Sequence, residues 1–178
     1  MIQRVLENGA RYQSMVVCLL CTVMLAALPV AADPIKLAIF DFELEDGSAG
    51  ASSTVAADTK QLTSVTNDVR QLFERSGRYI PIDGSTADAD AARAHMLRDC
   101  NACAAVIARL LGADQSFVGV VRRVSRTEYT VRFEIRDART GTISSDGDSG
   151  LRMGAGYSWG RGAIRLIKDR LLENQARQ

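Results

Sequence analysis

The stretch from Cys100 to Val124, CNACAAVIARLLGADQSFVGVVRRV, constrains the fold of this chain more than any other. Its first half carries apolar residues at the spacing of one helical face: Cys103, Val106, Ile107, Leu110 and Leu111. Gly112 then offers the left-handed conformation that ends a helix. The β-branched and aromatic residues from Phe117 to Val121 favour a strand. We therefore expect a short helix followed directly by a buried strand.

The remaining apolar patterns extend this helix–strand unit into a complete domain. Alternation of apolar and polar residues predicts strands at 35–44, 79–82, 128–137 and 142–151, with a hairpin turn at 137–141. Helical periodicity predicts helices at 54–76, 87–97 and 159–171. The resulting order, β-α-β-α-α-β-β-β-α, predicts an α/β (α+β) domain in which helices pack on a mixed sheet of about five strands.

The first 32 residues have the pattern of an export signal. Two arginines precede an apolar run at 15–28, which is shorter than the roughly 20 residues that span a bilayer. Small residues up to Ala32 predict cleavage there, which would leave a single periplasmic domain over 33–178 with no stable membrane span. An uncleaved membrane anchor and a lipoprotein signal at Cys18 or Cys21 remain as alternatives.

Charge is balanced overall but unevenly distributed. The chain has 22 basic and 21 acidic residues, and residues 33–178 alone are neutral. Because a neutral domain has no field that attracts nucleic acid, we expect no nucleic-acid partner. Arginines nonetheless prevail in the second half, at Arg122, Arg123, Arg126, Arg132 and Arg136. These predict either a solvated sheet face or a docking surface for an acidic partner, with Arg132 and Arg136 as candidate contacts.

Cys100 and Cys103 are the two cysteines that remain after cleavage at Ala32. In an oxidising compartment, an even pair this close indicates a local disulfide. Such a pair can be a structural clamp or a thiol–disulfide redox centre, since a helix N-terminus lowers the pKa of a thiol. The residues before Cys100 lack the strand and the aromatic residue of a thioredoxin-like site, and no proline follows Pro81, so the clamp is favoured.

Other candidate chemistry is incomplete. Gly156–Gly160 matches the G-x-S-x-G nucleophile motif, but no histidine follows Ser158, and we expect this serine to cap the last helix. His95 with the two cysteines supplies three ligands where a structural zinc site needs four. Asp41 and Glu43 are typical of an acidic strand end. We therefore expect no catalytic residue, no metal and no cofactor.

Several short runs follow the pattern of one known family. They are Ala38–Leu44, Ser76–Tyr79, Cys100–Cys103 with Leu111–Asp114, Gly119–Ser125 and Asp137–Gly141. Together they resemble a family of small secreted proteobacterial proteins of unknown function, over nearly all of residues 33–178. The order of elements is more loosely similar to the amino-terminal domain of TolB and to the CsgG and LpoB envelope proteins. That similarity implies an anticodon-binding-like fold and a role in binding proteins, not in catalysis.

The leading functional hypothesis is a non-enzymatic adaptor or accessory domain that binds another periplasmic or envelope protein. Its candidate partner-binding residues are Arg132, Arg136, Tyr157 and Trp159. One alternative is a thiol–disulfide redox protein that uses Cys100 and Cys103. The family resemblance implies a second alternative, an accessory to a periplasmic quinoprotein dehydrogenase, because some relatives are encoded near such enzymes. A third is a small-ligand site in the glycine-rich loop around Tyr157 and Trp159.

Overall fold

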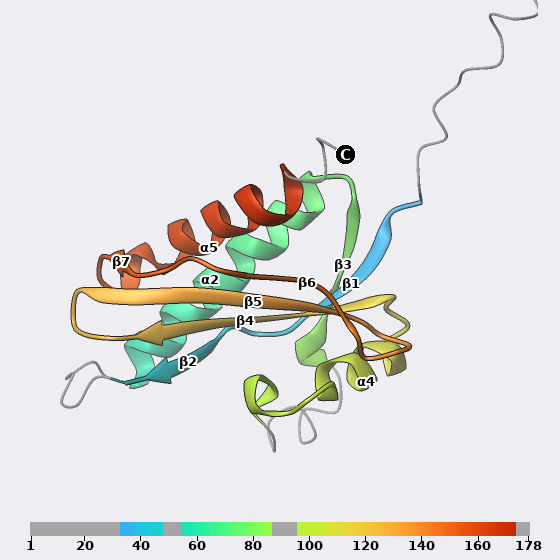
Figure 1. Ribbon diagram of the computed structural model, residues 1–178, viewed down its shortest axis with the longest axis horizontal. Helices are drawn as coiled ribbons and strands as arrows, with labels where there is room; N and C mark the ends of the chain where they lie inside the picture. Colours follow the sequence, from blue (N-terminus) through green and yellow to red (C-terminus); the bar gives the residue numbers. More distant parts are fainter. Residues whose placement is uncertain (1–32, 48–54, 87–95, 174–178) are drawn as a thin grey trace, which may run out of the picture. The chain divides into compact units, whose positions relative to one another are not determined.

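The computed structural model describes residues 33–47, 55–86 and 96–173. A seven-stranded sheet forms the centre of this part of the chain. Its strands are β1 (Ile35–Ile39), β2 (Glu43–Asp46), β3 (Tyr79–Asp83), β4 (Gln115–Arg123), β5 (Glu128–Asp137), β6 (Ile143–Asp148) and β7 (Arg152–Met153). Their order is β3-β1-β4-β5-β6, with β2 beside β4 and β7 beside β5 (Figure 1). Parallel pairs around β1 and antiparallel pairs around β5 make the sheet mixed.

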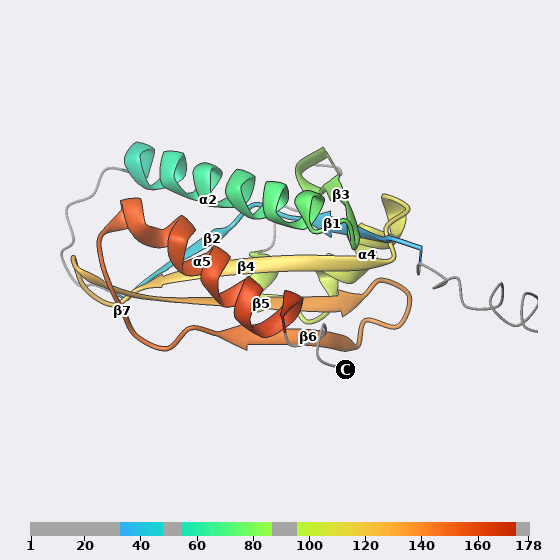
Figure 2. The ribbon, with the colours of Figure 1, turned by 90° about the horizontal axis from the view of Figure 1, so that it is seen from above.

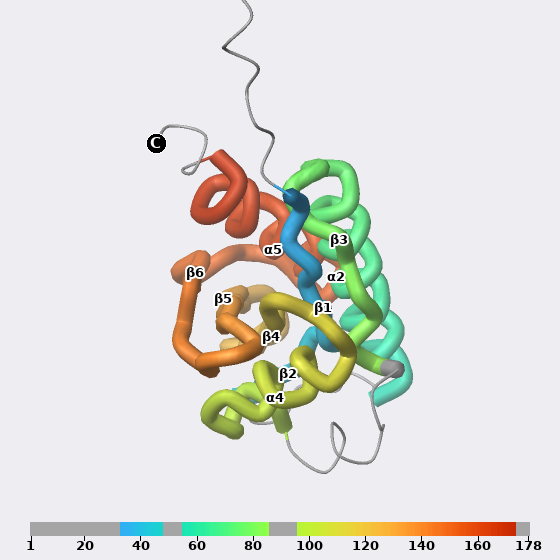
Figure 3. Tube along the Cα trace, turned by 90° about the vertical axis from the view of Figure 1, so that its right-hand side faces the viewer, coloured from blue at the N-terminus to red at the C-terminus, as the bar shows by residue number. Residues whose placement is uncertain are grey.

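Helices lie on both faces of this sheet. The three α-helices described are α2 (Val55–Arg75), α4 (Cys103–Leu110) and α5 (Trp159–Ile167), which continues into the π-helical turn η4 (Lys168–Leu172). Short 3-10 turns are η1 (Gly84–Thr86), η2 (Leu97–Asp99) and η3 (Gly156–Ser158). Figure 2 shows α2 and α5 side by side over one face, and Figure 3 shows α4 on the other. The predicted mixed α+β class is confirmed.

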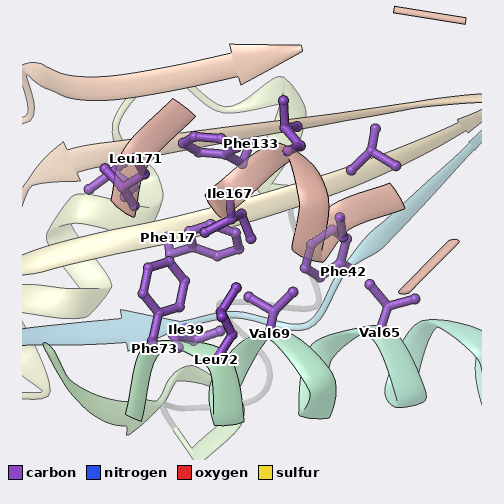
Figure 4. Packing of buried hydrophobic residues seen from close by; sticks show 14 of the residues in the cluster. Ile39, Phe42, Val65, Val69, Leu72, Phe73, Phe117, Phe133, Ile167 and Leu171 are labelled. Carbon is purple, nitrogen blue, oxygen red and sulfur yellow. The ribbon is translucent and has the colours of Figure 1, made fainter. Parts of the chain in front are cut away.

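The larger hydrophobic core lies between the sheet and the pair α2 and α5 (Figure 4). Phe117 of β4 stands at its centre, with ring centroids 5.3 Å from Phe73 of α2 and 5.8 Å from Phe133 of β5. A smaller cluster lies under α4, where Ala104 and Ala108 allow the helix to approach the sheet closely. Residues 34–178 form one compact unit.

The expected strand over 35–44 is divided in two by a β-bulge. Ile39 lies opposite Phe117 and Glu43 lies opposite Val120, so four steps on this strand match three on β4. Asp41, which is exposed, falls inside this irregular stretch. Asp41 and Glu43 therefore do not form the acidic pair that regular alternation would produce.

A threonine of α2 satisfies the backbone that the bulge leaves without a ladder partner. The buried hydroxyl of Thr66 accepts a hydrogen bond from the Phe42 N–H at 2.9 Å and donates to the Leu62 carbonyl at 3.0 Å. Because the backbone is irregular here, Phe40 and Phe42 lie in different hydrophobic clusters, although residues two apart on a regular strand share a face. The bulged segment therefore packs against helices on both faces of the sheet.

Helix α4 occupies the predicted place but buries only part of the predicted face. Val106 and Leu110 were expected inside, yet they are 50% and 79% exposed. Ile107 is buried as predicted, and Ala104 and Ala108 are buried beside it, because their small side chains let this short helix lie close to the sheet. Alanine is apolar and occurs at three positions of this helix, so the periodicity alone does not show that the buried face is centred on Ala104 and Ala108.

The second half of the domain agrees with the sequence pattern. The Asp137 carboxylate accepts hydrogen bonds from the Arg139 and Thr140 amides, and Gly141 has a φ of 72°, which confirms the predicted hairpin turn. Strand β6 lies at an edge of the sheet, as expected for a polar strand. The helix expected at 87–97 falls almost entirely outside the described residues.

Candidate functional site

A cavity of about 440 Å³ opens on the sheet face that carries η2 and α4. One wall is the segment from Leu97 to Asn101, and the floor includes Val118 and Val120 of β4. The other wall comes from alternate residues of β5 and β6: Arg132, Glu134, Arg136, Asp146 and Asp148. The cavity thus joins two parts of the chain that the sequence analysis treated separately, the cysteine pair and the arginine-rich strand.

Glu43 holds the η2 wall of the cavity against the sheet. Its carboxylate accepts hydrogen bonds from the backbone N–H of Leu97 at 2.6 Å and of Arg98 at 3.3 Å. The Arg98 guanidinium also pairs with Glu43, at 3.2 Å, and donates to the Leu44 carbonyl. An acidic residue that follows the bulge therefore has a structural role in positioning this wall.

Cys100 and Cys103 are joined as a disulfide, with their Cα atoms 5.6 Å apart. Cys103 is the first residue of α4, and Ala102 before it adopts a left-handed conformation with φ 68°. Cys100 lines the cavity and is partly exposed. The pair therefore fastens the η2 wall to the start of α4 and also presents one sulfur-bearing residue to the cavity.

The two arginines expected to contact a partner both line the cavity, but they differ in exposure and in how firmly neighbouring groups hold them. Arg132 is 48% exposed, and its ion pair with Glu45 is long, at 3.8 Å. Arg136 is largely buried, and all three of its nitrogens donate to the Glu134 carboxylate or to the Gly141 carbonyl. Arg132 is therefore the more available of the two.

Acidic residues compensate the arginines on this face. The β5–β6 register places Asp146 opposite Glu134 and Asp148 opposite Arg132. Among the described residues, neither aspartate forms an ion pair with a basic side chain. The residues predicted from the sequence do not include these aspartates, although the alternating D-G-D pattern of the edge strand is a signal that identifies them.

The expected basic face is also smaller than the sequence implied. Arg123 points to the opposite face of the sheet and is buried, where it pairs with Asp46 at 3.0 Å and with Asp58. Its guanidinium carbon lies 5.3 Å from the centre of the Trp159 ring. Neighbouring residues on a strand point to opposite faces, which is why Arg122 and Arg123 have different environments.

Tyr157 and Trp159 do not line the cavity. Trp159 is 2% exposed and belongs to the large core, so in this fold it is not available to a partner or ligand. Tyr157 is 70% exposed, and the Arg161 guanidinium lies 5.9 Å from the centre of its ring. The amphipathic pattern of α5 explains the burial of Trp159, because its apolar side faces the sheet.

Ser158 is a structural residue in a buried position. Its hydroxyl donates to the Ala155 carbonyl at 2.7 Å, and its own carbonyl accepts a hydrogen bond from the Tyr129 hydroxyl at 3.0 Å. The expected side-chain cap of α5 is therefore not made, although Ser158 occupies the N-cap position. His95 lies outside the described residues, and within them no cluster of histidine, cysteine and carboxylate side chains could hold a metal ion.

The chain belongs to the DUF3280 family, described as "Protein of unknown function (DUF2380)", whose model matches residues 35–171. This confirms the resemblance to a family of unknown function. No curated protein matches the chain. None of the helices described here is long and apolar enough to cross a membrane.

Three solved structures illustrate the fold likeness. The LpoB C-terminal domain from Salmonella enterica is 18% identical, with a TM-score of 0.46, over 74% of this chain and 91% of that one. A PelC dodecamer from Paraburkholderia phytofirmans is 19% identical, with a TM-score of 0.48, over 84% and 94%. TolB from Acinetobacter baumannii is 16% identical, with a TM-score of 0.48, over 83% of this chain but 29% of that one. Likeness at this level assigns no function.

Proposed function

We propose that this protein is a non-enzymatic interaction domain of the cell envelope, which binds another envelope protein at the cavity between η2 and strands β4 to β6. The lining of the cavity carries this proposal. Charged side chains from two distant segments surround an apolar floor of Val118 and Val120. An apolar centre with a polar rim is the usual composition of a protein-binding surface.

Export to the periplasm is part of the same proposal and rests on the pattern of residues 1–32. Cleavage after Ala32 would leave Asp33 as the first residue of the exported protein. Intact-mass measurement of protein recovered from a periplasmic extract tests this directly. Recovery of the full-length mass from the membrane fraction would instead support a retained anchor.

Site-specific photo-crosslinking in living cells tests the location of binding. A photoreactive residue at Asn101, an exposed residue in the cavity wall, should capture a discrete envelope protein. The matched control is the same residue at Arg165, an exposed position on α5 on the other side of the sheet. Equal products from both positions, or none from Asn101, would refute the proposed site.

A thiol–disulfide function is the second candidate, because Cys100 lines the cavity. Replacing Cys100 by Ser distinguishes the two roles. If the disulfide is a clamp, the variant should lose about 2 kcal/mol of stability, since the closed loop is short, and should keep its crosslinked partner. A disulfide-exchange activity in the wild type that disappears in the variant would instead support the redox function.

A further inference from the structure

We propose that the partner presents a basic, extended segment that pairs with the edge of β6 and places lysine or arginine side chains beside Asp146 and Asp148. This inference rests on the proposed function, because it names the chemistry of the partner at the same cavity.

Strand β6 is the end of the sheet on this side. Among the described strands it pairs with β5 alone, so its outer row of N–H and C=O groups has no neighbouring strand there. The register shift between β5 and β6 lies near Ile143, and the residues from Ser145 to Asp148 pair regularly. The strand contains neither lysine nor proline, which often protect such edges. An exposed edge of this kind can accept an added strand.

The acidic side chains of β6 point to the cavity face. Asp146 and Asp148 both line the cavity, two residues apart. Gly147 between them faces the other side, where a Cβ atom would lie 2.7 Å from the Phe133 ring. Side chains of an added strand repeat with the same period of two, so alternate residues of the partner would lie beside these two carboxylates.

The uncompensated charge at this edge is negative. Arg136 is saturated by Glu134 and a carbonyl, and Arg98 is engaged by Glu43. Arg132, which lies opposite Asp148, forms its ion pair with Glu45 instead, at 3.8 Å. The two aspartates form no ion pair among the described residues, and Asp146 lies opposite another acid, Glu134. Because Glu134 is already paired with Arg136, the carboxylates left for an incoming cationic side chain are those of Asp146 and Asp148. The structure thus favours a basic segment, whereas an acidic partner was one of the two interpretations of the arginine-rich sequence.

Peptide binding to the purified protein tests the inference. The probe is an acetylated peptide of four lysine–valine repeats, and its affinity is measured by calorimetry at low ionic strength. We expect the peptide to bind and its affinity to fall about threefold to tenfold in D146N/D148N, because two exposed ion pairs between its lysines and the aspartates are lost. The side-chain amide oxygen in D148N can still accept the hydrogen bond that the Asp148 carboxylate receives from the Gly150 amide, so the turn is preserved. E74Q/D169N, which makes the same change of charge on the helical face, should bind like the wild type.

Hydrogen exchange separates strand pairing from simple charge attraction. The lysine–valine peptide should slow amide exchange in residues 143–148, and a version N-methylated at alternate residues should not. Equal binding of a glutamate–valine peptide, or equal affinity of D146N/D148N and wild type, would overturn the inference. If the peptide does not bind but a photoreactive residue at Asn101 still captures a partner, the basic segment alone is refuted. Failure of both experiments would refute the proposed function as well.

Discussion

Replacing Arg123 by methionine is expected to destabilise the protein by about 3 kcal/mol, because it removes the cation that pairs with a mostly buried carboxylate. The Arg123 side chain is 8% exposed and forms ion pairs with Asp46 and Asp58. The Asp58 side chain is itself mostly buried. These contacts join the end of β4 to the start of α2 and the end of β2, and the guanidinium also lies over Trp159 of α5. Methionine keeps the apolar stem of the side chain and lacks the guanidinium, so the main change is the loss of the charge and of its hydrogen bonds.

Urea denaturation followed by the fluorescence of Trp159, the single tryptophan, measures this effect. The neighbouring Arg122 provides a control, because it is 58% exposed and pairs with Glu45 at 3.4 Å on the other face. Arg122→Met should change stability by less than about 0.5 kcal/mol. Adding Asp58→Asn to Arg123→Met should restore part of the loss, because it removes the negative charge that Arg123 balanced. Equal effects at positions 122 and 123, or no recovery in the double variant, would refute this reasoning.

Two further predictions concern stability. Thr66→Val should cost about 1–3 kcal/mol in the same assay, since the Phe42 N–H loses its buried acceptor. Thr63→Val, at an exposed position on the same helix, is the control, and an equal loss there would contradict the proposed role of Thr66. Burial raises the pKa of Asp83, but hydrogen bonds from Ser85 and the charge of Arg70 outweigh it and lower the pKa overall. The carboxylate therefore stabilises the fold above the unfolded-state pKa of about 4, and this contribution is lost as pH falls through the folded pKa. The stability difference between wild type and Asp83→Asn should shrink on acidification, and a constant difference would exclude this linkage.

Local chemistry explains why most elements could be predicted from the sequence. The strand at 128–137 alternates because one side of it is buried, and the hairpin that follows depends on one carboxylate and one left-handed glycine within five residues. The period of 3.6 residues likewise identified the long helix at 54–76, observed as Val55–Arg75. These signals depend on residues close together in the chain, so they can be recognised without knowledge of the fold.

Features of the candidate site depended on which distant segments meet. Glu43 supports the cavity wall only because the chain brings it to Leu97, 54 residues later. Arg123 is buried and Arg122 exposed because β4 is covered by α2 and α5 on one side alone at that point. Neither relation has a local signature, since each requires the pairing of strands and helices to be known.

The sequence by itself determined the succession of helices, strands and turns, the mixed α+β class and the closeness of Cys100 to Cys103. The tertiary structure alone decided which face of α4 is buried, where β1 and β2 separate, and what charge the cavity presents. Alternation along a strand shows which residues share a face, but the register with the next strand decides whether their charges are matched or repelled. That register places Asp146 opposite Glu134 and Asp148 opposite Arg132, and so determines which charges meet at the edge of the sheet.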